Sequence, residues 1–364
     1  MSLRAHFPGT ARHIVPEAER VGGRVCETIC LLNQEIASTP SGERRLAMTK
    51  FMLELAMKNN KTRLRYWLNL FLAAIVIVAL GFIGLIVDFS YRQTQSYLRP
   101  ARQHSTGEFL KANGIQYQNI ELTTEDGLKL AAWYTPPQNG LVILVAHGHA
   151  ASRLEDMYAL FASHGYGVLA WDFRAHGDSQ GDFTSLGYYE VLDVKAALDY
   201  ALAQPDVKHI GGWGGSMGAV TMIRSAAKYP EIEAVVTDSP FSTLVDELGV
   251  RVPYPVISPL IRFFAEWQTG LNMNDIRPVD DVALISPRPI FIIQGMKDEM
   301  VPLDSAQRIY DAAGEPKQLW TEPDAVHLGM YSSHPEEYAE KVIGFFDEYL
   351  LNKNSLKVFK TFRD

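Results

Sequence analysis

The sequence predicts an α/β protein: a mostly parallel, eight-stranded sheet with helices on both faces, a short helical cap, and one transmembrane helix in front of it. Three observations lead to this class. Short apolar runs alternate with helical stretches beyond residue 116, which is typical of a parallel sheet. A 22-residue apolar run, 66–87, precedes them. The composition, 47% hydrophobic and 21% charged over 364 residues, indicates a sizeable core and excludes disordered and collagen-like chains.

The apolar run 66–87 contains one clearly polar side chain, Asn69. A helix of this length spans about 33 Å, enough to cross a hydrocarbon core of about 30 Å. A buried core helix is usually shorter. A cleaved signal peptide has an apolar region of about 7–15 residues and a small-x-small cleavage site, which the segment 84–88 does not offer. The run therefore predicts an uncleaved signal-anchor helix.

Positive charges on the two sides of this helix indicate its orientation. Five basic residues lie in the twenty before it, Lys50, Lys58, Lys61, Arg63 and Arg65, and three in the twenty after it, Arg92, Arg99 and Arg102. Because cytoplasmic flanks carry the excess of Lys and Arg, we expect residues 1–65 inside the cell and the rest of the chain outside the cytoplasm.

The first 65 residues leave two hypotheses open. The segment that begins at Met57 has the form of a complete signal-anchor start, so translation could begin there. Alternatively, the chain begins with a cytoplasmic segment that has an amphipathic helix near 44–57.

The charge distribution excludes one class of partner. Residues 1–65 carry a net charge of +5 and residues 66–364 carry −13, so the large domain has no basic surface for nucleic acid.

Residues 88–115 are polar, contain Pro100, and predict a linker with one helix. A domain over 116–351 follows, and then a polar tail, 352–364. The predicted strands are 120–123, 128–134, 141–146, 167–171, 209–213, 234–237, 289–294 and 318–321. The first two flank the turn Glu125-Asp126-Gly127 as a hairpin, and the others alternate with helices such as 188–203, 217–228 and 335–351.

An insertion at about 239–287 separates two of the parallel strands. Phe263, Phe264 and Trp267 recur in it at helical spacing, which often means packing onto the body of a domain. The insertion also follows the carboxyl end of a strand, where open α/β sheets bind ligands. We therefore expect a cap in which these three aromatic residues line an acyl or alkyl pocket.

The strongest motif is Gly214-Gly215-Ser216-Met217-Gly218, which follows a strand and opens a helix. This is the G-x-S-x-G nucleophile elbow in the strand–turn–helix context that it requires. The tight turn leaves no room for side chains two positions on either side of the serine, hence Gly214 and Gly218. We expect Ser216 to be the nucleophile.

A serine nucleophile needs a base and an acid that orients the base, in the chain order Ser, Asp or Glu, His. His327 follows the last strand and is the predicted base, whereas His334, which enters the last helix, is predicted to lie at the surface. Asp298 leaves the preceding strand at its carboxyl end and is the preferred acid. Asp238, after the strand 234–237, is the alternative.

An oxyanion needs two backbone N–H donors. One is expected from Met217, the first residue of the helix after the elbow. The other is expected from His149, because the loop after the strand 141–146 has Gly148 for close backbone approach. We expect no metal and no cofactor.

From about residue 120 to 350 the chain resembles the α/β-hydrolase superfamily, in particular membrane-anchored bacterial members grouped with prolyl oligopeptidase-like and serine aminopeptidase-like hydrolases. The matching motifs are HGHAASR at 147–153, DFRAHGDSQG at 172–181, GGSMGA at 214–219, DSPF at 238–241, GMKDEMVP at 295–302 and VHLGMY at 326–331. The resemblance implies a serine hydrolase that uses Ser216, Asp298 and His327 and no cofactor. Gln294 stands where these relatives usually have His, a departure expected to bear little on catalysis.

We expect the enzyme to be carboxylesterase-like and to cleave a small-molecule or lipid-like ester or thioester through an acyl-enzyme. A peptidase or aminopeptidase acting on short peptides is the alternative. It would need a site for a charged substrate terminus. Epoxide hydrolase and dehalogenase chemistry is disfavoured because those relatives have a carboxylate where this chain has Ser216. The sequence does not predict the oligomeric state.

Overall fold

The computed structural model describes residues 41–352 and divides into two compact units, Met1–Ile83 and Gly84–Asp364. The long helix α2 (Ser41–Leu98) begins in the first unit and ends in the second. Among the described residues it is the helix long and apolar enough to cross a membrane, with a mean hydropathy of 3.1 over its most apolar window. Residues 1–40, which hold most of the predicted cytoplasmic segment, and the tail 353–364 lie outside the described residues.

The helix α2 continues through residues that the sequence assigns to a linker. Its last turns bury Ser90, Thr94 and Leu98, which recur every four residues and so share one helix face, against the second unit. Packing therefore keeps a polar segment helical. The helix ends before Pro100, because the residue preceding a proline disfavours helical angles. One short helix, α3 (Glu108–Ala112), lies in the remainder of the linker.

The second unit is built on an eight-stranded sheet with the order β1-β2-β4-β3-β5-β6-β7-β8. Strands β1 and β2 form the predicted hairpin, β2 pairs antiparallel with β4, and all other neighbours are parallel. The strands are β1 (Gln118–Thr123), β2 (Lys129–Thr135), β3 (Leu141–Ala146), β4 (Gly167–Trp171), β5 (His209–Gly215), β6 (Ala234–Asp238), β7 (Ile290–Gly295) and β8 (Lys317–Glu322).

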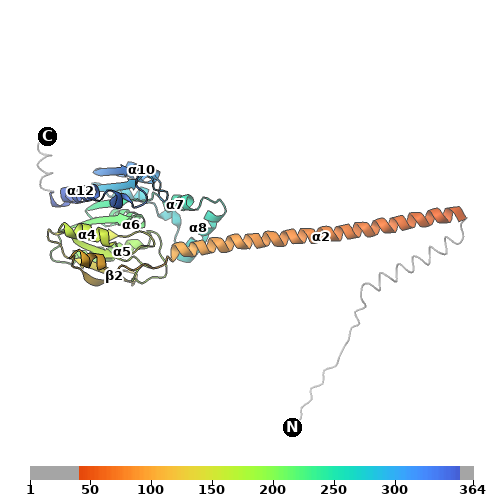
Figure 1. Cartoon of the computed structure of the whole chain (residues 1–364), viewed down its shortest axis with the longest axis horizontal. Helices are drawn as coiled ribbons and strands as arrows, with labels where there is room; N and C mark the ends of the chain where they lie inside the picture. The colour runs from red at the N-terminus through yellow and green to blue at the C-terminus, as the bar shows by residue number, and fades with distance from the viewer. Residues whose placement is uncertain (1–40, 353–364) are drawn as a thin grey trace, which may run out of the picture. The chain divides into compact units, whose positions relative to one another are not determined.

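Two hydrophobic clusters fill the two faces of this sheet. Strand β3 contributes Val142 and Leu144 to one cluster and Ile143 and Val145 to the other, as the alternation of side chains along a strand requires. The first face is covered by α5 (Glu190–Leu202), α6 (Met217–Lys228) and α10 (Leu303–Ala312), and the second by α4 (Glu155–Ser163) and α12 (Pro335–Phe346) (Figure 1). The predicted last helix ends in a short π-helical turn, η3 (Asp347–Leu351).

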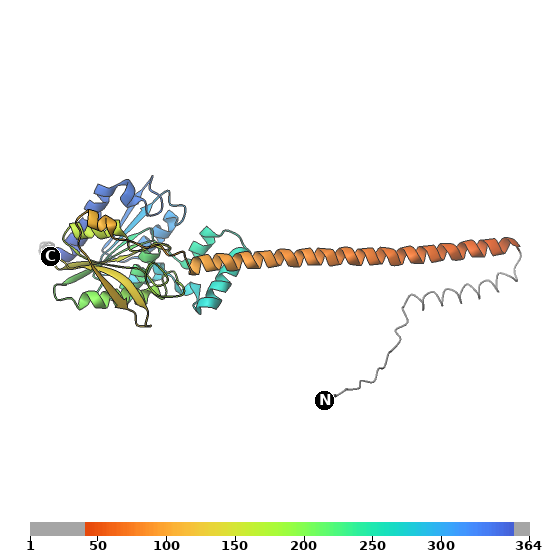
Figure 2. The same cartoon turned by 60° about the horizontal axis from the view of Figure 1, so that its bottom comes forward.

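The insertion after β6 forms the predicted cap. Its helices α7 (Leu244–Arg251) and α8 (Ile257–Thr269) are followed by three short helical turns, η1 (Met273–Asp275), α9 (Pro278–Asp281) and η2 (Val282–Leu284). A third hydrophobic cluster joins the cap to α6 through residues such as Leu248 and Val220. In Figure 2 the cap helices (teal) lie beside the last turns of α2, which contact helix α8.

Candidate active site

Ser216 occupies the turn between β5 and α6 with a positive φ of 53° and a ψ of −116°. Such angles are unfavourable for a residue with a Cβ and persist only where the surroundings enforce them. The Ser216 N–H donates to the carbonyl oxygen of Asp238 on the neighbouring strand, at 2.8 Å. The serine is therefore held at the carboxyl edge of the sheet with its side chain turned out of the strand.

The two glycines of the elbow are required by close packing. A Cβ on Gly214 would lie 2.3 Å from the carbonyl oxygen of Gly218, and a Cβ on Gly218 would lie 2.2 Å from that of Ala146 at the end of β3. Both distances are well below van der Waals contact. The predicted role of Gly214 and Gly218 thus has a direct physical cause.

The structure brings Ser216, His327 and Asp298 into one hydrogen-bonded series. His327 Nε2 lies 3.0 Å from Ser216 Oγ, and His327 Nδ1 lies 2.7 Å from Asp298 Oδ2. Three loops, after β5, β7 and β8, supply these side chains, because the carboxyl ends of parallel strands meet at one edge of a sheet. In this geometry His327 can accept the serine proton while Asp298 holds the other ring nitrogen.

The carboxylate of Asp298 is kept ionised. Burial alone would raise its pKa, but the hydrogen bond with His327 and those from the N–H groups of Val301 and Met300, at 2.8 and 2.9 Å, lower the pKa below its ordinary value. Gln294 Nε2 also donates to Asp298 Oδ2, at 3.0 Å. Gln294, which stands where relatives usually have His, is expected from the sequence to bear little on catalysis. In the structure its side chain contacts the candidate acid directly.

Asp238, the alternative acid, has different partners. Its carboxylate accepts hydrogen bonds from the Ser239 hydroxyl at 3.0 Å and the Tyr338 hydroxyl at 3.1 Å. Complete burial raises its pKa to about 6. Ser239 Oγ in turn accepts a bond from the N–H of Leu328, at 3.2 Å. Asp238 thus braces the loop that carries His327 rather than the imidazole itself.

The loop after β3 lies against the serine. A Cβ on Gly148 would lie 3.5 Å from Ser216 Cβ, an ordinary van der Waals contact, so the packing at this position does not by itself require the predicted glycine. The next residue, His149, lines the same pocket as Ser216 and Met217, and its Nε2–H donates to the Tyr97 carbonyl at 2.8 Å. Burial lowers the pKa of His149 to about 4, so its ring is neutral near pH 7. Met217 begins α6, where first-turn N–H groups lack intrahelical acceptors.

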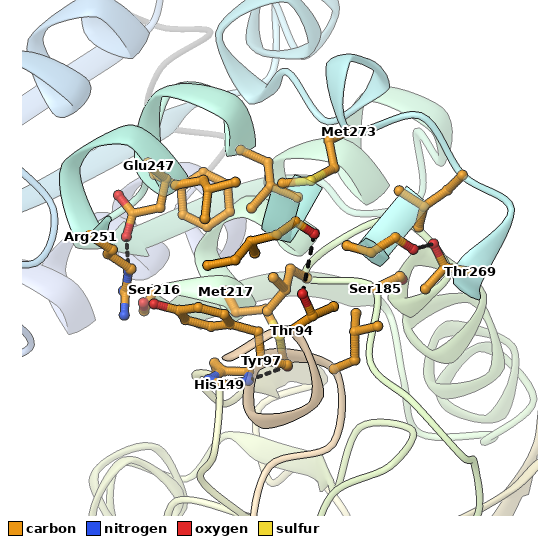
Figure 3. A pocket seen from close by; sticks show the side chains of 18 residues that line it. Thr94, Tyr97, His149, Ser185, Ser216, Met217, Glu247, Arg251, Thr269 and Met273 are labelled. Carbon is orange, nitrogen blue, oxygen red and sulfur yellow. Dashed lines mark hydrogen bonds and ion pairs between the residues drawn. The ribbon is translucent and has the colours of Figure 1, made fainter. Parts of the chain in front are cut away.

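An apolar pocket of about 730 Å³, including the part open to solvent, begins at Ser216. Figure 3 shows the side chains around it. The apolar lining comes mainly from the cap, with Met217 from the start of α6, and Thr94, Tyr97 and Leu98 add a wall from the end of α2. Its principal apolar residues are Leu98, Met217, Phe241, Leu244, Leu248, Ile261, Ala265, Leu271 and Met273.

The prediction that Phe263, Phe264 and Trp267 line the pocket is wrong. Helix α8 turns Ile261 and Ala265, four residues apart, toward the pocket, and this rotation points Phe263 and Trp267 outward, where they are exposed. Phe264 packs edge-on against Tyr91 of α2, with ring centroids 5.5 Å apart. The spacing correctly indicated a helix but could not tell which of its faces meets the serine.

Several pocket residues had no signal in the sequence. Glu247 and Arg251 form an ion pair on α7 at the pocket wall (Figure 3), and the second oxygen of Glu247, Oε2, is buried without a hydrogen-bond partner. Burial raises the pKa of this carboxyl. A charged pair four residues apart on a helix usually lies at the surface, so only the fold reveals this one.

His334, predicted to lie at the surface, is not among the residues that line the pocket. His334 begins α12 and its Nε2 lies 3.5 Å from Glu322 Oε1. Within the described part of the chain, no group of three or more His, Cys, Asp or Glu side chains is arranged to hold a metal ion.

Comparison with known proteins finds a family match and similar chains. Residues 153–353 match the prolyl oligopeptidase family. An uncharacterized protein of Mycobacterium tuberculosis is 29% identical over 265 residues, 70% of this chain and 88% of that protein. The α/β-hydrolase domain-containing protein WAV2 of Arabidopsis thaliana is 26% identical over 301 residues, 76% of this chain and 93% of its own. The solved structure of the Pyrococcus furiosus esterase Pf2001 matches with a TM-score of 0.59 and 29% identity, over 69% of this chain and 99% of that one.

Gly218→Ala should displace the elbow, because the added methyl group meets the Ala146 carbonyl. We expect a loss of about 1–3 kcal/mol in the free energy of unfolding, together with weaker reaction of Ser216 with a fluorophosphonate. The matched control is Gly249→Ala on α7, where a Cβ would meet nothing within 4 Å. Removing that helical glycine should leave stability unchanged or raise it by about 0.5–1 kcal/mol. Chemical denaturation of both variants checks the prediction, and equal stabilities would contradict it.

Asp298→Asn should keep the fold but lower kcat by about 10⁴, because an amide favours the wrong tautomer of His327. Asp238→Asn should lower it far less, because the Asp238 carboxylate contacts Ser239 and Tyr338 rather than the imidazole, and the amide oxygen can still accept one of these two hydrogen bonds. Steady-state ester turnover, with circular dichroism as the control for folding, checks this ranking. The reverse ranking would transfer the role of acid to Asp238.

Proposed function

We propose that this chain, which belongs to the prolyl oligopeptidase family of α/β-hydrolases, is a serine hydrolase. It cleaves carboxylic esters or thioesters through an acyl-enzyme on Ser216. The observation that carries the proposal is the hydrogen-bonded series of Ser216, His327 and Asp298, with distances of 3.0 and 2.7 Å. A strained serine beside an imidazole that an acid orients is the arrangement of an activated nucleophile.

The mechanism follows from these groups. Asp298 accepts the Nδ1–H of His327 and so leaves Nε2 free to take the proton of Ser216 as its oxygen attacks the acyl carbonyl. The N–H groups of His149 and Met217 would bind the oxyanion of the tetrahedral intermediate. His327 then gives its proton to the leaving alcohol or thiol, and water, deprotonated by the same imidazole, releases the acid.

The apolar lining of the pocket supports an ester with a medium-length acyl chain. Side chains such as Leu248, Ile261 and Met273 offer no hydrogen-bond partners for a peptide backbone, whereas they can contact methylene groups. The similarity to the Pyrococcus furiosus esterase supports the same substrate class.

One observation favours a second candidate, a peptidase for short peptides or amides. The free oxygen of Glu247 at the pocket wall could accept hydrogen bonds from a substrate ammonium group. Arg251 already pairs with this carboxylate, which leaves little net negative charge for a second cation. We therefore place ester cleavage first.

The location of the enzyme is also a proposal. The apolar segment of α2 would make it a single-pass protein of the cell membrane. The excess of basic residues before that segment supports a catalytic domain outside the cytoplasm.

Ser216→Ala should abolish both fluorophosphonate labelling and ester turnover, because the nucleophile is lost. His327→Ala should lower turnover by about 10³–10⁶. Labelling of the purified full-length protein in detergent, followed by mass spectrometry of the modified peptide, checks the assignment. Substantial activity in either variant would rule it out.

Turnover of octanoyl esters and thioesters should exceed that of acetyl esters, because a longer chain fills the apolar pocket. Ala265→Phe should reverse this preference by narrowing the pocket, whereas Phe263→Ala on the outward face should leave it unchanged. Kinetics on an ester series, with matched aminoacyl and dipeptidyl anilides in parallel, check the prediction. Faster cleavage of the anilides, sensitive to Glu247→Gln, would favour the peptidase instead.

A further inference from the structure

We infer that the outer face of the cap, formed by Tyr254, Val256, Phe263 and Trp267, lies in the headgroup region of the membrane that α2 crosses. This surface is called the cap face below. The inference rests on α2 as the membrane anchor and not on the chemistry at Ser216.

Helix α8 has three faces with different surroundings. Ile261 and Ala265 face the pocket, and Phe264 and Gln268 face α2. The third face leaves Phe263 57% and Trp267 69% exposed, although the two aromatic residues lie four positions apart and so form one stripe. Large apolar side chains gathered in this way on a surface mark an interaction site.

Helix α8 packs on α2 close to Val87, the last residue of the apolar run, within the second unit. Tyr91 packs on Phe264, Thr94 Oγ1 lies 3.3 Å from the Ile261 carbonyl oxygen, and Gln95 Nε2 donates to Gln268 Oε1 at 2.8 Å. All these residues belong to the second unit. The apolar run ends at Val87, and at 1.5 Å per residue Tyr91 follows it by about 6 Å along the helix. Helix α8 is therefore held at the level where the hydrocarbon core gives way to headgroups.

The side chains of the cap face have the character of a membrane–water interface. Aromatic side chains are enriched at the interface between membrane and water, and the cap face presents three of them beside the exposed rings of Phe89 and Tyr91 on α2. The two charges of α8, Arg262 and Glu266, pair with each other at 2.9 Å, so the helix adds no net charge to this surface. The favoured occupant is a zwitterionic lipid surface rather than a charged protein partner.

A cap face that lies at the membrane surface would place the pocket close to substrates in the bilayer. The same helix presents one face to lipid and another to the pocket that begins at Ser216. An ester dispersed in the bilayer would then reach the pocket without leaving the membrane surface.

The test uses the full-length protein in phosphatidylcholine vesicles. Cys26 and Cys30 are changed to Ser, and a single cysteine is introduced by Phe263→Cys and labelled with the environment-sensitive dye NBD. The matched control is Glu340→Cys on α12, which is also exposed. We expect blue-shifted emission from position 263 and about twofold quenching by lipids that carry a nitroxide near the headgroup, since interfacial helices lie 5–10 Å into that boundary. The control should be neither shifted nor quenched.

Two outcomes would overturn the inference. An unshifted, unquenched signal at position 263 would place the cap face in water. A blue shift without quenching by the labelled lipids would mean that protein, such as a second copy of the chain, covers it. Neither readout depends on catalysis, so failure here and failure of the proposed function are distinguishable.

A second measurement links the surface to substrate delivery. The double variant Phe263→Ser, Trp267→Ser should turn over a short water-soluble ester at the rate of the unaltered protein. It should cleave a long-chain ester embedded in the vesicles several-fold more slowly. Equal loss on both esters, or no loss on either, would contradict a role for this face at the membrane.

Discussion

The strained turn at Ser216 is the constraint on which the site depends. Its positive φ holds only because Gly214 and Gly218 let α6 and β3 approach within distances that no Cβ would permit. The position of the candidate nucleophile and a boundary of the pocket thus follow from one local conformation.

The other groups of the site are braced around that turn by buried polar contacts. Asp298 receives two backbone N–H groups and the amide of Gln294, which fix its carboxylate beside His327. Asp238 holds Ser239, which in turn holds the backbone next to His327. Because the carboxylate oxygens of Asp298 and Asp238 each accept from specific donors, the imidazole has little freedom to leave the serine.

The last turns of α2 and the pocket are parts of one arrangement within the second unit. The last turns of α2 wall the pocket with Thr94 and Tyr97, and the Tyr97 carbonyl fixes the ring of His149. Helix α8 packs on those turns and contributes Ile261 and Ala265 to the same pocket. The segment after the apolar run therefore does more than connect two parts of the chain, and its truncation would open the pocket.

The sequence by itself determined the order and type of the elements, since apolar periodicity and the elbow glycines are local properties. The bounds of β3, β4 and α6 agree with those predicted. It also singled out Ser216, His327 and Asp298, because each follows the carboxyl end of a strand. Only the tertiary structure decided which face of α8 meets the pocket, that α2 continues to Leu98, that Gln294 contacts Asp298, and that Glu247 lines the pocket. Those features depend on contacts between residues far apart in the chain, which no local pattern records.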